Sequence, residues 1–558
     1  MKKIIPTILY CFLLFCSPSS KGIVLDEKEL ETKIDALIPA GINDSTPGLV
    51  IGIVQKGKLI FSKGYGLANI SYGIPNDPKM VYNIGSVSKQ FLGYAFAMLH
   101  VKGKLNIDDP VGKYLENWPE FKHKVTIRHL LSHTSGYREA YTLSILAGRV
   151  IGVDRLSRKE CLDVVRNQPQ LEFIPGSRHT YNSTAWVILA EILEKVTGQP
   201  ADVWVKVNIL KPLEMNDTQI ENYIGEVIIN AAESYSYDKD QGYKNLKSNR
   251  AIFGASDVYS SIDDMVKWIN NLKTAEVGGK KVNDLFLKPF ILNDGSNSEY
   301  AFGIVNGSYR GLKLYSHTGA HEAFHTQLSY FPDQDLGIIM VSNFGGKGWL
   351  APSKIADLLL EKDMVLQTDK VYPSFEIKKE QLKQFEGLYL SSDFNKTLNF
   401  RFIEDTLRIG WRTKLTPVSH SNFRIKGDSN IEFKFKNISN NKTQLTIVHG
   451  QKDNSYFKVE KWTPDRAELS TYVGDFWSDE LETVYHLIMK GNNLIIKHRW
   501  LGEVSLVPIT NDVFKTYWGF YVKFNRDKDG KVSSLSANSG NTIANYGSTL
   551  NVIFHRKE

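Results

Sequence analysis

The hydrophobic pattern divides the chain into two parts with different periodicities. Up to about residue 365, long apolar runs alternate with amphipathic stretches, which is typical of helices packed on a sheet. After Lys370 the pattern changes to many short alternating segments separated by polar turns, which is typical of small all-β domains. We therefore expect an α/β (α+β) domain with an antiparallel sheet and covering helices, followed by all-β domains.

The same pattern predicts individual elements in the first part. They are an amphipathic helix at 27–40, a hairpin at 48–54 and 58–62, a buried helix at 185–193, strands at 312–316, 324–331 and 336–343, and a closing helix at 353–361. The pattern also predicts a short helix within residues 126–136 that ends in a polar turn. The hairpin and the three later strands are expected to form one antiparallel sheet, which helices from between them cover.

The second part contains an internal repeat. Residues 382–389 match residues 469–476 at an offset of 87, and Leu407 matches Leu494 at the same offset. The pairs at an offset of 91 are Phe423 with Phe514 and Phe433 with Phe524. The steady offset predicts two duplicated β-domains, and short, evenly spaced strands favour small barrels.

The N-terminus has the pattern of an export signal. Lys2 and Lys3 precede an apolar run of 13 residues that ends at Cys16, and a small polar stretch follows. This run is too short to span a bilayer, and no other stretch is long and apolar enough to do so. We expect residues 1–21 to be a signal peptide and the protein to be periplasmic or secreted. Lipid anchoring at Cys16 is less favoured, because Phe15 stands where a small residue is expected.

Charge and cysteine content narrow the classes of partner. The net charge of +7 falls to +5 once Lys2 and Lys3 leave with the signal peptide, and the chain has no basic cluster. Nucleic acid is therefore not an expected partner. Cys161 is the one cysteine of the mature chain, so no intramolecular disulfide is expected.

Candidate chemistry begins at Ser86-Val87-Ser88-Lys89. An apolar run without proline follows, so we expect a buried helix that begins at or just before Ser86. Residues three apart share a helix face, so the Ser86 hydroxyl and the Lys89 amine can meet as nucleophile and base. Free N–H groups of the first turn can stabilise the negative charge that develops in acyl transfer.

Ser-x-x-Lys alone is a weak motif. It begins at Ser86, Ser236, Ser439 and Ser455. The ordinary interpretation of such a match is a serine at a helix N-terminus followed by a surface lysine. Ser86 differs from the others because it alone opens a long apolar helical run.

A serine and a lysine still need an oriented proton carrier and a second oxyanion donor. The candidates are Tyr181-Asn182-Ser183, at a junction between a loop and a helix, and Ser316-His317-Thr318-Gly319-Ala320. Each also fits a structural role when taken alone, because Tyr181 suits a core position and His317 suits a strand end.

The order of the three motifs resembles that of the serine β-lactamase and penicillin-recognising enzyme superfamily. Its nearest branches are the class C β-lactamases, the serine DD-peptidases, the related carboxylesterases and the D-aminopeptidases. Residues 103–110, 126–136 and 258–264 are also similar to this family, and the resemblance covers about residues 25–362. It implies a β-lactamase/transpeptidase-like catalytic domain.

The resemblance extends to the domain organisation. In D-aminopeptidases of this superfamily, two lipocalin-like barrels follow the catalytic domain, and the repeat is similar to this arrangement. We expect a catalytic domain at residues 22–365, a first barrel at 366–465 and a second barrel at 466–558.

Carried over to this chain, the resemblance implies roles for four residues. Ser86 would be the acylated nucleophile, and Lys89 and Tyr181 would share its proton. Tyr181 would pass that proton to the leaving group. The backbone N–H groups of Ser86 and Ala320 would form the oxyanion hole.

Two positions depart from the family pattern. Ser183 stands where the family usually carries asparagine, so recognition of a substrate amide is in question. His317 stands where most β-lactamases carry lysine, a variant also found among DD-peptidases and D-aminopeptidases. The resemblance places His317, Thr318 and Gly319 along the substrate cleft.

His321-Glu322-Ala323-Phe324-His325 also fits the zincin pattern, in which a helix holds both histidines on zinc. Here the sequence from Phe324 onward alternates as in a strand, and no third ligand is evident. We expect neither a metal ion nor another cofactor.

The sequence thus predicts an exported serine hydrolase that works through an acyl-enzyme. Its expected substrates are small amides, esters or peptides containing D-amino acids, including those derived from peptidoglycan. A β-lactamase remains an alternative, as does a non-catalytic cell-wall binding or sensor protein.

Overall fold

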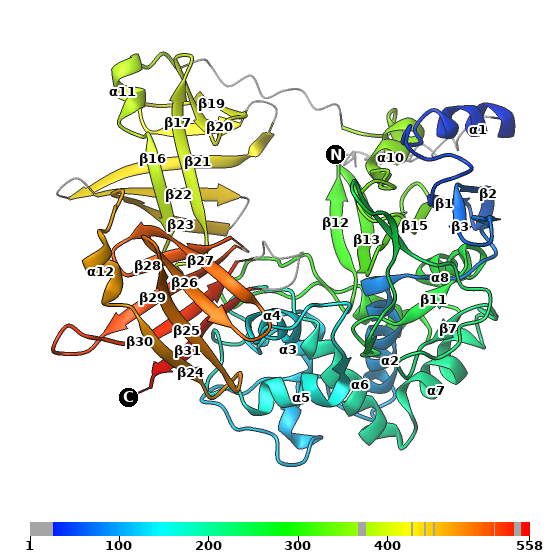
Figure 1. Cartoon of the computed structure of the whole chain (residues 1–558). Helices are drawn as coiled ribbons and strands as arrows, with labels where there is room; N and C mark the ends of the chain where they lie inside the picture. The colour runs from blue at the N-terminus through cyan, green and yellow to red at the C-terminus, as the bar shows by residue number, and fades with distance from the viewer. Residues whose placement is uncertain are drawn as a thin grey trace, which may run out of the picture.

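The computed structural model describes residues 26–365, 375–425, 428–439, 442–449, 452–517, 519–540 and 548–557. The predicted signal peptide, Cys16 and the change of pattern at Lys370 lie outside the described residues. Figure 1 shows a mixed α and β domain beside two β-barrels.

A six-stranded antiparallel sheet forms the middle of the first domain, in the order β12-β13-β14-β15-β1-β2. Its strands are β1 Leu49–Gln55, β2 Lys58–Tyr65, β12 Val305–Tyr309, β13 Leu312–His321, β14 Phe324–Phe331 and β15 Leu336–Ser342. Leu49 pairs with Ser342 and Gln55 with Leu336, so β1 joins the N-terminal hairpin to the late strands. The prediction that these segments share one sheet is confirmed.

The alternation of side chains along β1 explains how helices cover both faces of the sheet. Leu49, Ile51 and Ile53 lie in a buried cluster with residues of α1 and α10. Val50 and Val54 point to the opposite face and join the larger cluster around α2, α6 and α8. The helices of this domain are α1 Glu27–Asp35, α2 Lys89–Val101, α3 Ile127–Leu131, α4 Ala140–Leu146, α5 Arg158–Arg166, α6 Thr184–Thr197, α7 Ala201–Val205, α8 Ile262–Thr274, α9 Lys280–Phe286 and α10 Pro352–Leu360.

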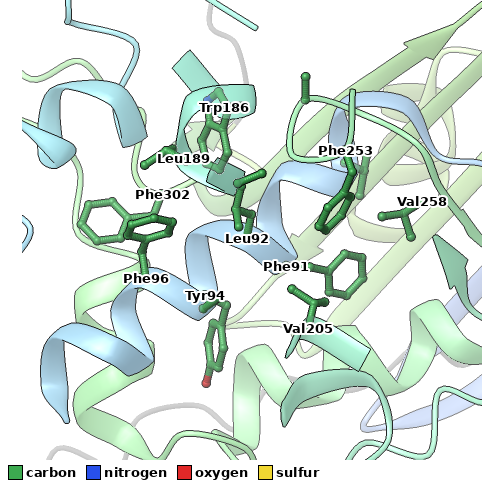
Figure 2. Close-up of a cluster of buried hydrophobic side chains, with 14 of the residues drawn as sticks. Phe91, Leu92, Tyr94, Phe96, Trp186, Leu189, Val205, Phe253, Val258 and Phe302 are labelled. Atoms are coloured by element: carbon green, nitrogen blue, oxygen red, sulfur yellow. The ribbon is translucent and has the colours of Figure 1, made fainter. Parts of the chain in front are cut away.

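Helix α2 is the centre of the larger cluster. Every residue from Lys89 to Leu99 is buried, which explains the uninterrupted apolar run in the sequence. Figure 2 shows the side chains around it, with Phe91, Leu92, Tyr94, Phe96, Trp186, Leu189, Val205, Phe253, Val258 and Phe302 labelled. This packing fixes the N-terminal end of α2, where Ser86 and Lys89 lie.

Short strands and turns connect these elements. They are β3 Leu67–Asn69, β4 Ile74–Pro75, β5 Tyr82–Asn83, β6 Leu156–Ser157, β7 Gln219–Ile220, β8 Tyr235–Asp238, β9 Gly242–Asn245, β10 Arg250–Ala251 and β11 Val258–Ser260, with helical turns η1 Gly85–Ser88, η2 Val111–Lys113 and η3 Lys206–Leu210. Among the described residues, no helix combines the length and the apolar character needed to cross a membrane.

Two closed antiparallel barrels follow, each preceded by a short helix: α11 Lys379–Lys383 and α12 Arg466–Ser470. Barrel 1 consists of β16 Gly387–Ser391, β17 Thr397–Ile403, β18 Thr406–Ile409, β19 Thr413–Pro417, β20 Asn422–Ile425, β21 Asp428–Ser439, β22 Lys442–His449 and β23 Lys452–Val459. Barrel 2 consists of β24 Gly474–Ser478, β25 Thr483–Lys490, β26 Asn493–His498, β27 Gly502–Thr510, β28 Val513–Thr516, β29 Phe520–Arg526, β30 Val532–Ser539 and β31 Thr549–Arg556. The two barrels that the repeat predicts are confirmed.

The repeated residues occupy equivalent places in the two barrel cores. Phe385 packs on Phe423 with ring centroids 5.3 Å apart, and Tyr472 packs on Phe514 at 5.2 Å. All four side chains are buried. The sequence repeat therefore corresponds to a repeated aromatic core.

Candidate active site

Ser86 lies in the 3₁₀ turn η1, which leads directly into α2. The sequence predicts a helix that begins at or just before the serine, and the structure differs only in the tighter form of its first turn. The Lys89 amine donates a hydrogen bond to Ser86 Oγ at 3.1 Å and another to the carbonyl oxygen of Ala255 at 2.5 Å. Nucleophile and candidate base are thus in direct contact.

Burial sets the protonation of Lys89. Its side chain is fully buried, and the loss of hydration lowers its pKa from 10.5 to about 7. The carboxylates of Glu139 and Asp257 oppose this shift, because their negative charge favours the ammonium form. A substantial neutral fraction at neutral pH makes this amine a suitable general base.

Glu139 and Asp257 are site residues that the sequence analysis missed. Burial raises the pKa of Glu139 to about 7 and that of Asp257 to about 6, while the charge of Lys89 lowers both. Glu139 accepts a hydrogen bond from the Ser183 N–H at 2.5 Å, and Asp257 accepts one from the Ile252 N–H at 2.7 Å. No local sequence pattern marks either residue, because distant segments bring them to Lys89.

Tyr181 lies three residues before α6, as the sequence predicts. Its ring centroid is 5.1 Å from Lys89 Nζ, and its ring packs on the His133 ring with 4.1 Å between centroids. The Tyr181 hydroxyl is buried next to Ser86 but makes no hydrogen bond of good geometry within the described residues. Burial raises the pKa of Tyr181 well above 10, so the phenol carries its proton at neutral pH.

Strand β13 brings the third motif, Ser316-His317-Thr318-Gly319-Ala320, against the Ser86 turn. Its last pair with β12 is Ser316 with Val305, so its later residues extend beyond that neighbour. A Cβ on Gly319 would lie 2.1 Å from the Ile84 carbonyl oxygen, and one on Gly85 would lie 2.5 Å from the Ala320 nitrogen. The absence of side chains at these two glycines lets the backbones of Ser86 and Ala320 come together.

His317 is held by hydrogen bonds within the domain. Its imidazole is buried, whereas Thr318 is exposed. The Nε2 atom accepts a hydrogen bond from the Tyr300 hydroxyl at 2.8 Å, and Nδ1 donates to the Thr318 carbonyl at 2.6 Å. Burial and the charge of Lys89 lower the pKa of His317 to about 3. This ring is therefore neutral, and both nitrogen atoms are engaged.

Ser183 also has a structural position, as the residue that immediately precedes α6. Its side chain is largely buried, and its N–H is the group that donates to Glu139. The neighbouring Asn182 donates through its amide to the carbonyls of Tyr137 at 2.7 Å and Arg138 at 3.1 Å. The second motif is thus anchored on residues 137–139.

The zincin-like segment forms a hairpin rather than a helix. His321 ends β13, His325 lies on β14, and the Glu322–Ala323 turn connects the two strands. Among the described residues, no three His, Cys, Asp or Glu side chains are grouped to hold a metal ion. The strand expected from Phe324 onward is confirmed.

Comparisons with known proteins identify the family of the first domain. A sequence model of the Beta-lactamase family matches residues 34–360. The putative penicillin-binding protein PbpX of Bacillus subtilis (strain 168) is 27% identical over 322 residues, which cover 55% of this chain and 74% of that protein. A D-aminopeptidase of Cereibacter sphaeroides is 25% identical over 342 residues, which cover 60% of this chain and 63% of that protein.

The fold is also similar to that of a solved structure. The octameric penicillin-binding protein homologue from Pyrococcus abyssi aligns with a TM-score of 0.53 and 25% identity, over 78% of this chain and 100% of that one. The fold and the family match thus define the class of the first domain. The chain belongs to the β-lactamase family.

Proposed function

We propose that the protein is an exported serine hydrolase that forms an acyl-enzyme on Ser86. The observation that carries this proposal is the contact of 3.1 Å between Ser86 Oγ and a buried lysine amine with a lowered pKa. A serine hydroxyl is a weak nucleophile until an adjacent base accepts its proton, and Lys89 is placed to do so. The N-terminal pattern of the sequence supports export.

The two candidate proton carriers have different tasks in this proposal. Lys89 takes the proton from Ser86 as the hydroxyl attacks the substrate carbonyl. Tyr181, whose phenol is neutral, protonates the leaving group and recovers its proton from Lys89. The N–H groups of Ser86 and Ala320 stabilise the negative charge on the substrate oxygen. A catalytic hydrogen bond that is not closed in the free protein is common, so the position of the Tyr181 hydroxyl is compatible with this task.

The preferred substrates in this proposal are small amides, esters or D-aminoacyl compounds. Neutral His317 supplies no positive charge for a substrate carboxylate, because burial and the charge of Lys89 lower its pKa to about 3. Its nitrogen atoms already bond to Tyr300 and Thr318. The similarity to a D-aminopeptidase supports the same substrate class. A β-lactamase is the alternative enzyme, and a non-catalytic cell-wall binding protein is the alternative from another class.

We expect slower turnover of a cephalosporin than of simple esters and D-aminoacyl amides. A charged hydrogen bond to the carboxylate of the drug contributes about 1.5 to 3 kcal/mol, and a neutral one contributes about half of that. A neutral His317 should therefore reduce the efficiency by about 0.75 to 1.5 kcal/mol, or about four- to thirteenfold. The measurement is kcat/KM for a chromogenic cephalosporin, p-nitrophenyl acetate and D-alanine p-nitroanilide, with Ser86→Ala as background.

The ranking of the three substrates decides between the two enzyme classes. A cephalosporin value below both other values supports the proposal. A cephalosporin value a hundredfold above both would reject it in favour of a β-lactamase. No Ser86-dependent turnover of any of the three, together with no covalent labelling, would favour the non-catalytic alternative.

A further inference from the structure

Barrel 2 packs against helix α4 of the catalytic domain. Leu143 and Leu146 of α4 belong to the same buried cluster as the core residues of barrel 2. The hydroxyl of Tyr485, on β25, donates a hydrogen bond to the carbonyl oxygen of Leu146 at 2.6 Å. Figure 1 shows α4 directly beside the strands of this barrel. The C-terminal end of α4 is therefore held by barrel 2.

The other end of α4 is held through Arg138. This side chain is only 1% exposed, and its guanidinium donates to Glu480 of barrel 2 at 2.7 and 3.2 Å. It also donates to the carbonyl oxygen of Leu550 and to that of Asn551, the latter at 3.2 Å. Glu172 of the catalytic domain accepts a further hydrogen bond at 2.8 Å. A buried, planar guanidinium group with this many hydrogen-bond partners restricts the movement of the backbone at Arg138.

We call the hydrogen bonds between Arg138 and barrel 2 the Arg138 clamp. Glu139, the next residue, links this clamp to the second motif, Tyr181-Asn182-Ser183. One carboxylate oxygen caps α4 by accepting from the Tyr141 N–H at 3.3 Å, and the other accepts from the Ser183 N–H. The Asn182 amide also bonds to the Arg138 carbonyl. Barrel 2, Arg138, Glu139 and the loop that carries Tyr181 thus form one continuous set of buried contacts.

We propose that barrel 2 is a working part of the active site, because it holds the second motif in place through Arg138 and Glu139. In this role Arg138 and Glu480 are positioning residues, since neither contacts the reacting atoms. Misplacement of a catalytic group by about 1 Å can reduce a rate by about a hundredfold. Barrel 1 makes a different kind of contact with the catalytic domain, between the partly exposed side chains of Arg178 and Asp393. This inference rests on the proposed acylation of Ser86.

The test uses substitutions in barrel 2 that remove its hydrogen bonds to the Arg138–α4 region of the catalytic domain. Glu480→Ala leaves Arg138 paired with Glu172, so one buried cation still faces one buried carboxylate and the protein is expected to fold. Tyr485→Phe removes only the hydroxyl that bonds to Leu146. Inactivation of the full chain by a fluorophosphonate gives the rate constant kinact and the binding constant KI separately. Fluoride leaves without a proton, so kinact reports the activation of Ser86 by Lys89, on which Glu139 acts, and not the proton transfer from Tyr181. We expect kinact to fall about tenfold in Glu480→Ala and about threefold in Tyr485→Phe, with KI within twofold of wild type.

Matched control variants separate this effect from a general loss of stability. Glu503→Ala breaks an exposed ion pair with Lys490 on barrel 2, and Tyr521→Phe removes a buried hydroxyl that bonds to Thr397 of barrel 1. Both should keep the wild-type kinact. Glu480→Gln, which retains an acceptor for Arg138, should recover part of the loss. A change in KI without a change in kinact would overturn the inference, because it would show that the variants leave the activation of Ser86 unchanged.

The outcomes distinguish this inference from the proposed function. If the wild-type protein reacts and the folded Glu480→Ala and Tyr485→Phe variants react equally fast, barrel 2 does not position the site and the inference is wrong. Equal losses in the two control variants would also overturn it. If Glu480→Ala fails to fold, Tyr485→Phe decides. If the wild-type protein does not react at all, the proposed function fails, and the inference fails with it.

Discussion

Replacing Lys89 by methionine should lower the rate of Ser86 acylation by about 10²- to 10⁴-fold, the range for a positioned proton carrier. The Lys89 amine lies 3.1 Å from Ser86 Oγ, and its lowered pKa leaves much of it neutral at pH 7. Tyr181 cannot take over as the base, because burial keeps its phenol protonated. Methionine has a flexible, apolar side chain of similar length, so the fold should tolerate it in this buried position. The measurement is the rate of fluorophosphonate labelling.

The matched control for this variant is Lys239→Met. Lys239 completes the Ser-x-x-Lys sequence that begins at Ser236, but it is exposed near the end of β8. Its replacement should leave labelling unchanged. Labelling of Lys89→Met at nearly the wild-type rate would show that another group activates the serine.

Acylation should also rise with pH through about 7. Below its pKa the Lys89 amine is protonated and cannot accept the Ser86 proton, whereas above it the amine is neutral. For a single group of pKa about 7, about 1% of the amine is neutral at pH 5, so kcat/KM should fall by up to about a hundredfold below its plateau. The other groups that act on Lys89 are Glu139 and Asp257, which favour its charged form. Their own pKa values are about 7 and 6, so they lose charge over the same range and make the rise broader than that of an isolated amine. His317, with a pKa of about 3, stays neutral across this range, and burial lowers the pKa of His133 well below 6.5.

Glu139→Gln provides the control for this assignment. The amide oxygen can still accept from the Ser183 N–H, but the negative charge that raises the pKa of Lys89 is gone. The midpoint of the pH profile should therefore move to lower pH, and tryptophan fluorescence should show that the protein stays folded. A profile that is flat from pH 5 to 9, or that falls as pH rises, would contradict a neutral-lysine base.

The fold was predictable where the pattern of side chains reflects burial directly. Successive side chains of β1 point to opposite faces of the sheet, so Leu49 and Val50 lie in different buried clusters and both are apolar. The run after Lys89 is apolar because α2 is buried on all sides. The aromatic repeat predicted two barrels because Phe385 and Tyr472 play the same part in two cores. In each case, local sequence carries the information.

The parts that the sequence did not predict depend on contacts between distant segments. Glu139 and Asp257 reach Lys89 only through the tertiary fold, and single acidic residues in loops have no local signature. The burial of His317 depends on Tyr300, which lies outside its motif. Likewise, nothing local to Arg138 indicates that it binds Glu480, 342 residues later in the chain.

Peptide mapping of the protein after reaction with a fluorophosphonate tests directly whether Ser86 is the acylated residue. We expect one adduct per chain, on the peptide that contains Ser86, and none in Ser86→Ala. Ser236→Ala and Ser455→Ala should react like the wild-type protein, because neither serine opens a buried helix. An adduct confined to a peptide without Ser86, or a folded wild-type protein that forms no adduct, would show that Ser86 is not the nucleophile.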